Sequence, residues 1–349
     1  MPISLLVLFL PIIVEGMVKS SNTSNTLNQS SISIEYNKTL LSTINFNTTE
    51  LSSISAIDNL RYQISKILLK HYGVQLGFEE GDINSFWNWN GAEFDKNDIN
   101  RSHFEVITDS PKEGTKALKF IVHPDDVSNN GARTEVIHYS SNDFTKPILF
   151  DDGEEMWFHW YTRIPENTQI TNTWHIFTQW HQLPEPNGLP CPAGVTSQWC
   201  DAVPLGFNFK NSPQDGGLVF ELNVLNHTNA NPNGFDNLWR ENFVKGEWYE
   251  FLLHLIWSKC NNFRFDGKCI DTENKGLIEL WVNEDKKFTK TNRYTLDSDS
   301  QVYLKVYLKQ GLYHGLQNRS QITWTQTIDH DGMEYLSCKT NFPFSWLVC

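Results

Sequence analysis

The sequence is short of positive charge and of long hydrophobic runs, and both shortages exclude classes of protein. It has 28 Lys and Arg against 41 Asp and Glu, a formal net charge of −13. Nucleic-acid binding usually needs a basic surface, which this composition does not offer. The N-terminal apolar run, residues 3–14, is too short to span a bilayer. No internal repeat is sustained, which argues against a propeller or a β-helix.

Cysteine is also scarce, and no C-x-x-C or Cys/His cluster has the spacing of zinc ligands. The six cysteines form three close pairs: Cys191/Cys200, Cys260/Cys269 and Cys338/Cys349. The sequence leaves fifteen connectivities open. Loop closure favours the local pairs, because short loops lose the least entropy on closing. We therefore predict three local disulfides.

The N-terminal region has the features of a secreted protein. Residues 1–16 contain the apolar run followed by Gly16 and read as a signal peptide, although no Lys or Arg precedes the run. An uncleaved membrane anchor is the alternative, which the length of the run and Pro11 disfavour. Residues 17–53 are rich in Ser, Thr and Asn and predict a flexible linker. Glycosylation sequons occur at Asn22, Asn28, Asn37, Asn47, Asn100, Asn226 and Asn318. We expect an extracellular glycoprotein that is free of the membrane once the signal is removed.

Helical periodicity is confined to residues 54–73. Ile57, Leu60 and Ile64 recur at helical spacing, and Gly73 provides a stop. From residue 74 onward, short alternating runs are separated by Gly, Asn, Asp and Pro clusters. Residues 74–349 therefore predict a single all-β domain, a sandwich or jelly roll of two antiparallel sheets. The concave face of a curved sheet is a natural groove for an extended ligand.

The stretch QVYLKVYLKQGLYHG, residues 301–315, begins with strict alternation. Its aliphatic side chains point one way and its Tyr and Lys side chains the other, because strand side chains repeat with period two. The polar parity holds Tyr303, Lys305, Tyr307 and Lys309, and continues through Gly311 to Tyr313. Such a face suits a polymeric anion, although an ordinary amphipathic strand has the same alternation.

Two further strands carry reactive side chains. In WHIFTQWHQL, residues 174–183, Gln179 and His181 share one parity with His175 and Phe177. In GARTEV, residues 131–136, Arg133 and Glu135 share a face. His titrates near neutrality and can take a proton. An Arg held by a Glu can bind a carboxylate in bidentate fashion. Each of these pairs is also common in strands without a catalytic role.

Together, Arg133, Gln179, His181, Lys309 and Tyr313 suit β-elimination from a uronic acid polymer. That reaction needs a group that neutralises the sugar carboxylate, a base that removes the C5 proton, and an acid that protonates the departing glycosidic oxygen. Arg or Gln suits the first task, His or a deprotonated Tyr the second, and Tyr the third. No metal or nucleotide is required.

The motifs R-T-E, Q-W-H and Y-L-K-Q-G-L-Y, at residues 133–135, 179–181 and 307–313, resemble the signature strands of the β-jelly-roll polysaccharide lyases. These include heparin lyase I-like, glucuronan lyase-like and alginate lyases. The resemblance covers residues 75–330 and implies a concanavalin-like sandwich with a concave substrate groove. Leu308 stands where Phe is usual, and HGLQ follows Tyr313 where alginate lyases have N-Q. The motifs therefore favour the heparin lyase I and glucuronan lyase side.

The resemblance also implies residue roles. Arg133 and Gln179 would neutralise the carboxylate, His181 would act as base or neutraliser, and Tyr313 would act as acid or as both acid and base. Lys309 would bind substrate anion, beside Tyr303, Lys305, Tyr307 and Glu135 as groove residues. Some family members hold a structural calcium, whose ligands the sequence does not locate. The acidic composition favours a weakly sulfated or unsulfated uronan, and we expect a monomer.

Two other functions fit parts of the sequence. A lectin-like jelly roll would use the same Tyr, Trp and Lys residues for binding alone. A glycoside hydrolase needs two opposed acids. Glu221 and Glu250 lie on predicted strands, but neither belongs to a paired acidic motif.

Overall fold

The computed structural model describes residues 54–79, 102–124, 126–128, 131–140, 143–171, 173–184, 203–225, 235–259, 276–296, 304–315, 324–339 and 348–349. The chain divides into two compact units, residues 1–68 with 346–348 and residues 69–345 with 349. The signal, the linker, all seven sequons, Tyr303 and the first two cysteine pairs lie outside the described residues. Cys338 and Cys349 form a disulfide, which confirms the third predicted pair.

The predicted helix is α3 (Ile54–Tyr72). It ends where the sequence predicts, because the Gly73 N–H donates to the Leu69 carbonyl at 2.8 Å. Within the described residues, no helix combines the length and the hydrophobicity needed to cross a membrane.

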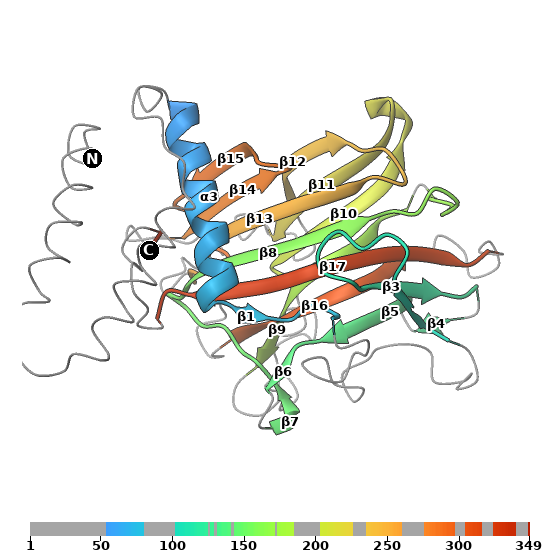
Figure 1. The fold of residues 1–349 in the computed structure, drawn as a ribbon, viewed down its shortest axis with the longest axis horizontal. Coiled ribbons are helices and arrows are strands. Elements are labelled where there is room, and N and C mark those ends of the chain that lie inside the picture. The colour runs from blue at the N-terminus through green and yellow to red at the C-terminus, as the bar shows by residue number, and fades with distance from the viewer. Residues whose placement is uncertain are drawn as a thin grey trace, which may run out of the picture. The chain divides into compact units, whose positions relative to one another are not determined.

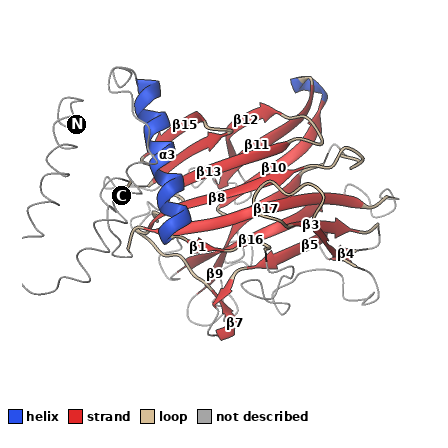
Figure 2. Cartoon of the chain, viewed as in Figure 1, coloured by secondary structure: helices blue, strands red, loops and turns tan. Residues whose placement is uncertain are grey.

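Two antiparallel sheets make up the β domain, as predicted (Figures 1 and 2). The eight-stranded sheet runs in the order β15-β14-β13-β8-β17-β3-β2, with β1 paired to β17. Its strands are β1 (Val74–Gln75), β2 (Phe104–Ile107), β3 (Ala117–Val122), β8 (Glu155–Arg163), β13 (Trp248–Ile256), β14 (Leu277–Val282), β15 (Asp285–Thr291) and β17 (Gln326–Ser337).

The seven-stranded sheet runs in the order β12-β11-β10-β9-β16-β5-β4. Its strands are β4 (Val127–Ser128), β5 (Gly131–Ile137), β9 (His175–Pro184), β10 (Leu205–Ser212), β11 (Gly217–Leu225), β12 (Phe235–Asn242) and β16 (Leu304–Gly315). The pair β6 (Tyr139–Ser140) and β7 (Asp143–Pro147) and the short 3-10 helix η3 (Pro213–Asp215) complete the described elements. Strand β16 therefore lies between β5 and β9, which brings the three predicted motifs side by side.

Large aromatic side chains fill the space between the two sheets. Phe158 of β8 meets Trp180 of β9 with ring centroids 4.9 Å apart, and Trp160 of β8 meets Phe207 of β10 at 5.1 Å. Val306 of β16 is fully buried in the same core. Burying this apolar surface is the main favourable contribution to folding, and it fixes which face of β16 points away from the core.

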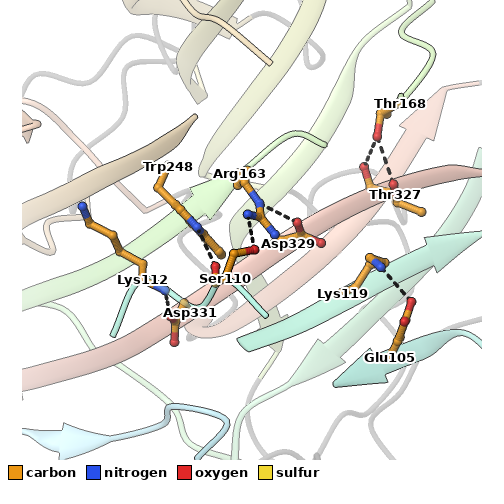
Figure 3. A network of polar contacts seen from close by, with 10 residues as sticks. All are labelled: Glu105, Ser110, Lys112, Lys119, Arg163, Thr168, Trp248, Thr327, Asp329 and Asp331. Atoms are coloured by element: carbon orange, nitrogen blue, oxygen red, sulfur yellow. Dashed lines mark hydrogen bonds and ion pairs between the residues drawn. The ribbon is translucent and has the colours of Figure 1, made fainter. Parts of the chain in front are cut away.

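A loop between β2 and β3 is tied to the outer face of the eight-stranded sheet (Figure 3). The Arg163 guanidinium donates to Asp329 at 2.8 Å and to the Ser110 hydroxyl at 2.7 Å. The Trp248 indole donates to the Ser110 carbonyl at 3.1 Å, and Asp331 accepts the Lys112 backbone N–H at 2.7 Å. These bonds satisfy polar groups that the fold buries.

Candidate functional site

The predicted site residues lie in one row across β5, β16 and β9, on the face of the seven-stranded sheet that points away from the core. Directly opposite pairs are Tyr313 with Arg133, Gly311 with Glu135, Lys309 with Gln179, and Tyr307 with His181. Opposite residues in antiparallel strands project to the same face. We call these residues, with Lys305, the groove row.

Tyr313 lies at one end of the groove row, between a cation and an aromatic ring. The Arg133 guanidinium carbon is 4.0 Å from the centroid of its ring. The Trp174 ring lies nearly perpendicular to the Tyr313 ring, and their centroids are 4.9 Å apart. Gly131 makes room for it, because a Cβ there would come within 2.5 Å of the ring atom Cε2. The phenol is thus held beside a permanent positive charge.

Glu135 connects this end of the row to Gln179 on the far side of β16. Its Oε2 lies 3.9 Å from an Arg133 nitrogen, and its Oε1 accepts a short hydrogen bond from the Gln179 amide. Gln179 is buried, and its Oε1 has no hydrogen-bond partner among the described residues. Tyr313, Arg133, Glu135 and Gln179 therefore form a chain of contacts across three strands.

Gly311 lies where β16 passes very close to β5. A Cβ on Gly311 would come within 2.2 Å of the Thr134 carbonyl oxygen and 2.7 Å of Glu135 Cα, and its φ of +150° also favours glycine. The glycine is needed for the close approach of β5, and it lies opposite the Glu135 that reaches towards Gln179.

His181 and Tyr307 lie towards the other end of the row. Their ring centroids are 5.4 Å apart. The His181 Nδ1 lies 3.1 Å from the Gln182 carbonyl, so in the neutral ring Nδ1 carries the proton and Nε2 the lone pair. Lys309, only 2% exposed, places its Nζ 5.6 Å from the Tyr307 centroid.

The structure does not bring His181 next to Tyr313. Tyr307, which lies opposite His181, precedes Tyr313 by six residues on β16. Five residues of β9 separate His181 from Ile176, which lies opposite Tyr313. At about 3.3 Å per residue, these separations are roughly 16–20 Å. The two side chains are therefore separate groups along the row rather than a contacting pair.

The prediction that Gln179 and His181 share a face with His175 and Phe177 is wrong. Phe177 and Trp180 both lie in the core, which two residues of opposite parity cannot do in a regular strand. A bulge explains this, because Thr178 lies opposite Phe207 while Ile176 lies opposite Asn208. The bulge turns His175 and Phe177 inward and leaves Gln179 and His181 on the outer face.

An imidazole from the facing sheet supports this irregular region from behind. The His330 Nε2 lies 3.1 Å from the Gly311 carbonyl, and its Nδ1 lies 3.1 Å from the Thr162 hydroxyl. Burial lowers the pKa of His330 to about 3 and also that of His175 to about 3. Both rings are therefore neutral hydrogen-bonding groups of the core rather than proton-transfer groups.

Sequence reasoning missed Trp174 and Gly131 as site residues. Trp174 precedes the bulge, which brings it to the groove face, and it is 39% exposed. No period-two pattern predicts a bulge. Gly131 was detectable, because it shares the parity of Arg133 and Glu135.

The two acids of the hydrolase alternative do not face each other. Glu221 lies on β11 of the seven-stranded sheet, where it pairs with Lys210 and Arg240. Glu250 lies on β13 of the other sheet and is bonded to His159. Because their core-facing neighbours are Phe220 and Phe251, the two acids point to opposite sides of the sandwich, away from any common ligand.

Comparisons with known proteins agree with the fold. The model of the family described as "Polysaccharide lyase" matches residues 78–333. Among curated proteins, no match is found. A family 7 alginate lyase, A1-II′, in complex with substrate is 12% identical, covering 76% of this chain and 99% of its own, with a TM-score of 0.50. This likeness confirms the predicted jelly-roll fold.

Two other solved structures are similar to this chain. An endo-β-1,4-glucuronan lyase from the fungus Trichoderma reesei is 16% identical, covering 72% of this chain and 94% of its own, with a TM-score of 0.46. The alginate lyase Aly36B is 12% identical, covering 75% of this chain and 96% of its own, also with a TM-score of 0.46. The predicted likeness to heparin lyase I stays a prediction.

Proposed function

This chain belongs to the polysaccharide lyase family, and from that premise we propose that it cleaves an unsulfated or weakly sulfated uronic acid polymer by β-elimination. The observation that carries the proposal is the chain of contacts from Tyr313 through Arg133 and Glu135 to Gln179. It combines a phenol with a guanidinium and an amide that suit a sugar carboxylate. The solved structures similar to it include enzymes named for glucuronan and alginate, which are both acidic polymers.

Arg133 and Gln179 neutralise the substrate carboxylate. The guanidinium donates in a planar fork that matches a carboxylate. The Gln179 amide has a second N–H besides the one bonded to Glu135. Hydrogen bonds to the carboxylate stabilise the charge that develops on it as the C5 proton leaves.

Tyr313 performs both proton transfers. As phenolate, stabilised by the Arg133 charge, it takes the C5 proton. The electron pair of the C5–H bond forms the C4–C5 double bond, and the C4–O bond breaks. The resulting phenol protonates the departing glycosidic oxygen, which returns Tyr313 to its starting state. We assign both transfers to Tyr313 because its ring lies against the Arg133 guanidinium, whereas His181 lies further along the row.

The remainder of the groove row binds neighbouring sugars. His181, Lys309 and Lys305 offer polar or positive groups, and Tyr307 offers a ring face for a sugar. Four such residues beyond the reacting sugar favour an extended chain over a small ligand. The positive charges are few, which favours carboxylated over densely sulfated polymers.

Incubation with glucuronan, alginate and heparin, read by ultraviolet absorbance, tests the proposal. The product of elimination is a conjugated unsaturated uronate that absorbs. We expect absorbance to rise with glucuronan or alginate and to stay low with heparin. Binding to all three without any rise would favour the lectin alternative, and a clear preference for heparin would overturn the proposed substrate class.

We also propose that the protein is secreted. The apolar run at residues 3–14 and the sequons support this, as does the Cys338–Cys349 disulfide, since such bonds persist in oxidising compartments. Expression in a eukaryotic host should deliver glycosylated protein to the medium, shown by a fall in mass after enzymatic deglycosylation. Retention of the unglycosylated chain inside the cell would contradict this proposal.

A further inference from the structure

Three side chains with metal-binding groups meet at the edge of the β domain. His103 directly precedes β2, His123 directly follows β3, and Asp126 directly precedes β4. One possible ligand atom from each lies within 4.8 Å of the others. His103 and Asp126 are almost fully buried. We propose that His103, His123 and Asp126 bind a divalent transition-metal ion, with zinc the best fit.

The spacing between His103 and Asp126 suits a metal site. The His103 Nε2 lies 3.1 Å from the Asp126 Oδ1. In a tetrahedral zinc site with bonds of about 2.0–2.1 Å, neighbouring ligand atoms lie about 3.3 Å apart. Two imidazole nitrogens and one carboxylate oxygen are ligands that favour zinc and its neighbours over calcium, which prefers six to eight oxygens.

The surroundings orient His123 and Asp126 as a metal site requires. The His123 Nε2 lies 3.0 Å from the Ser102 carbonyl oxygen, so Nε2 carries the proton and Nδ1 the lone pair. Metal-binding histidines usually donate their other N–H in this way. The Asp126 Oδ2 accepts the His123 backbone N–H at 2.6 Å, which turns Oδ1 towards His103. Three protein ligands leave the fourth position to water.

The site would fix the strand that carries Arg133. Ile121 of β3 donates its N–H to the His103 carbonyl, and the Thr134 hydroxyl of β5 donates to the Ile121 carbonyl. Strand β4 begins one residue after Asp126, and Val127 lies opposite Ala132, the neighbour of Arg133. An ion held here links β2, β3 and the turn into β5. The inference concerns metal binding and does not depend on the proposed reaction.

The competing explanation is a buried His–Asp hydrogen bond without a metal. The two explanations differ in what zinc does to the folded protein. A ligand that binds only the folded state raises its stability, and at 100 times the dissociation constant we expect Tm to rise by about 5 °C. A hydrogen-bonded pair without a metal site gives no such rise.

The experiment uses the full oxidised chain after removal of metal with a chelator, and compares it with His123→Gln and His71→Gln. His123 is only partly buried, so its variant should fold, and exposed His71 is the matched control. We expect about one zinc per chain by elemental analysis and a rise in Tm with zinc, for wild type and His71→Gln alike. His123→Gln should match their Tm in chelator but bind zinc at least about 100-fold more weakly.

Cobalt gives a second readout that does not involve activity. Bound Co²⁺ in a tetrahedral site of two imidazoles and a carboxylate should show visible absorption bands in the wild type that His123→Gln lacks. Equal zinc binding by both histidine variants, absence of zinc binding by the wild type, or binding of calcium in preference to zinc would each overturn the proposal.

Discussion

The two outer faces of the sandwich carry the same kinds of side chain but pair them differently. On the eight-stranded sheet, His159 lies 2.8 Å from both Glu250 and Glu334, and His254 lies 2.8 Å from both Glu155 and Glu279. Each imidazole there has a carboxylate on both nitrogens. On the seven-stranded sheet, the Arg133–Glu135 distance of 3.9 Å exceeds hydrogen-bond length, and Gln179 Oε1 is unsatisfied within the described residues.

The difference separates a stabilising network from the proposed binding site. Burial alone would lower the pKa of His159, but its hydrogen bonds to Glu250 and Glu334 outweigh burial and raise the pKa. In this network both nitrogens of each imidazole are already bonded to carboxylates, so neither ring can bind a ligand without losing a partner. The groove row keeps an unsatisfied amide oxygen beside a cation and a phenol, which a polar substrate can complete. Substitutions on the two faces should therefore have opposite consequences.

Tyr313→Phe should have the largest effect on activity, because it removes the hydroxyl proposed for both proton transfers. We expect the initial rate of ultraviolet absorbance to fall at least about 10³-fold, near the upper range for proton-transfer groups. Tyr161→Phe is the matched control on the other face, where the Tyr161 hydroxyl lies 3.4 Å from Glu250. It should keep near wild-type turnover. Substantial activity in Tyr313→Phe would exclude this residue as the acid.

Arg133→Lys should have the next largest effect. The charge remains, but the planar fork and the flat contact with the Tyr313 ring are lost. We expect kcat/KM to fall about 10²–10³-fold, as when one stabilising donor is removed from an active site. Arg163→Lys, in the closed network, should lower the unfolding midpoint and leave kcat/KM unchanged. If the two variants lost activity equally, the two faces would not differ in function.

His181→Ala should have a smaller effect, because His181 lies further along the row from Tyr313 than Arg133 and Gln179 do. We expect kcat/KM to fall about 10–100-fold, mainly through a higher KM, since a contact made equally in both states affects binding alone. Steady-state kinetics on one uronan measure this split. A loss as large as that of Tyr313→Phe, with KM unchanged, would assign the base to His181.

Asp331→Asn should leave activity unchanged and alter only how stability depends on pH. Burial raises the pKa of Asp331 to about 6, against the backbone N–H groups of Glu113 and Lys112, which lower it. The pKa of Asp331 is higher in the folded protein than in the unfolded chain. Its contribution to stability is therefore present below pH about 4 and is lost as the pH rises through about 6.

Denaturant unfolding at several pH values tests this prediction. From the size of the shift, the wild type should lose about 1–3 kcal/mol of unfolding free energy over this range because of Asp331. The Asn carbonyl oxygen can still accept the two N–H groups bonded to Asp331 Oδ2. The unfolding free energy of the variant should therefore fall less than that of the wild type as the pH rises. An unchanged pH dependence would contradict the shift. Burial also raises the pKa of Asp329 to about 6, although Arg163 lowers it. Part of the pH dependence of stability should therefore remain in both proteins.

The comparison also shows what the sequence could predict. Alternation in QVYLKVYLKQGLYHG and GARTEV assigned Val306 and Leu308 to the core and Arg133, Lys309 and Tyr313 to the opposite face, because those side chains keep their period of two. The helix and its end at Gly73 followed from local chemistry. The same alternation in EMWFHWYTR, residues 155–163, gave no sign that its His and Arg lie in a closed network, because their partners come from β13 and β17.

The bulge in β9 could not be predicted from the sequence, because it too depends on neighbouring strands. It depends on the pairing of β9 with both β10 and β16, and it reverses the parity of Trp174, His175 and Phe177. The separation of His181 from Tyr313 depends on the same pairing. Motif order indicated the candidate residues, and the register shows which of them lie opposite one another.

The most direct test of β-elimination is the number of double bonds formed per glycosidic bond broken. Wild-type protein acting on glucuronan, followed at once by ultraviolet absorbance and by new reducing ends, should give one unsaturated uronate for each new chain end. Tyr313→Phe should produce neither signal above background. New reducing ends without absorbance would mean hydrolysis rather than elimination, and would contradict the account.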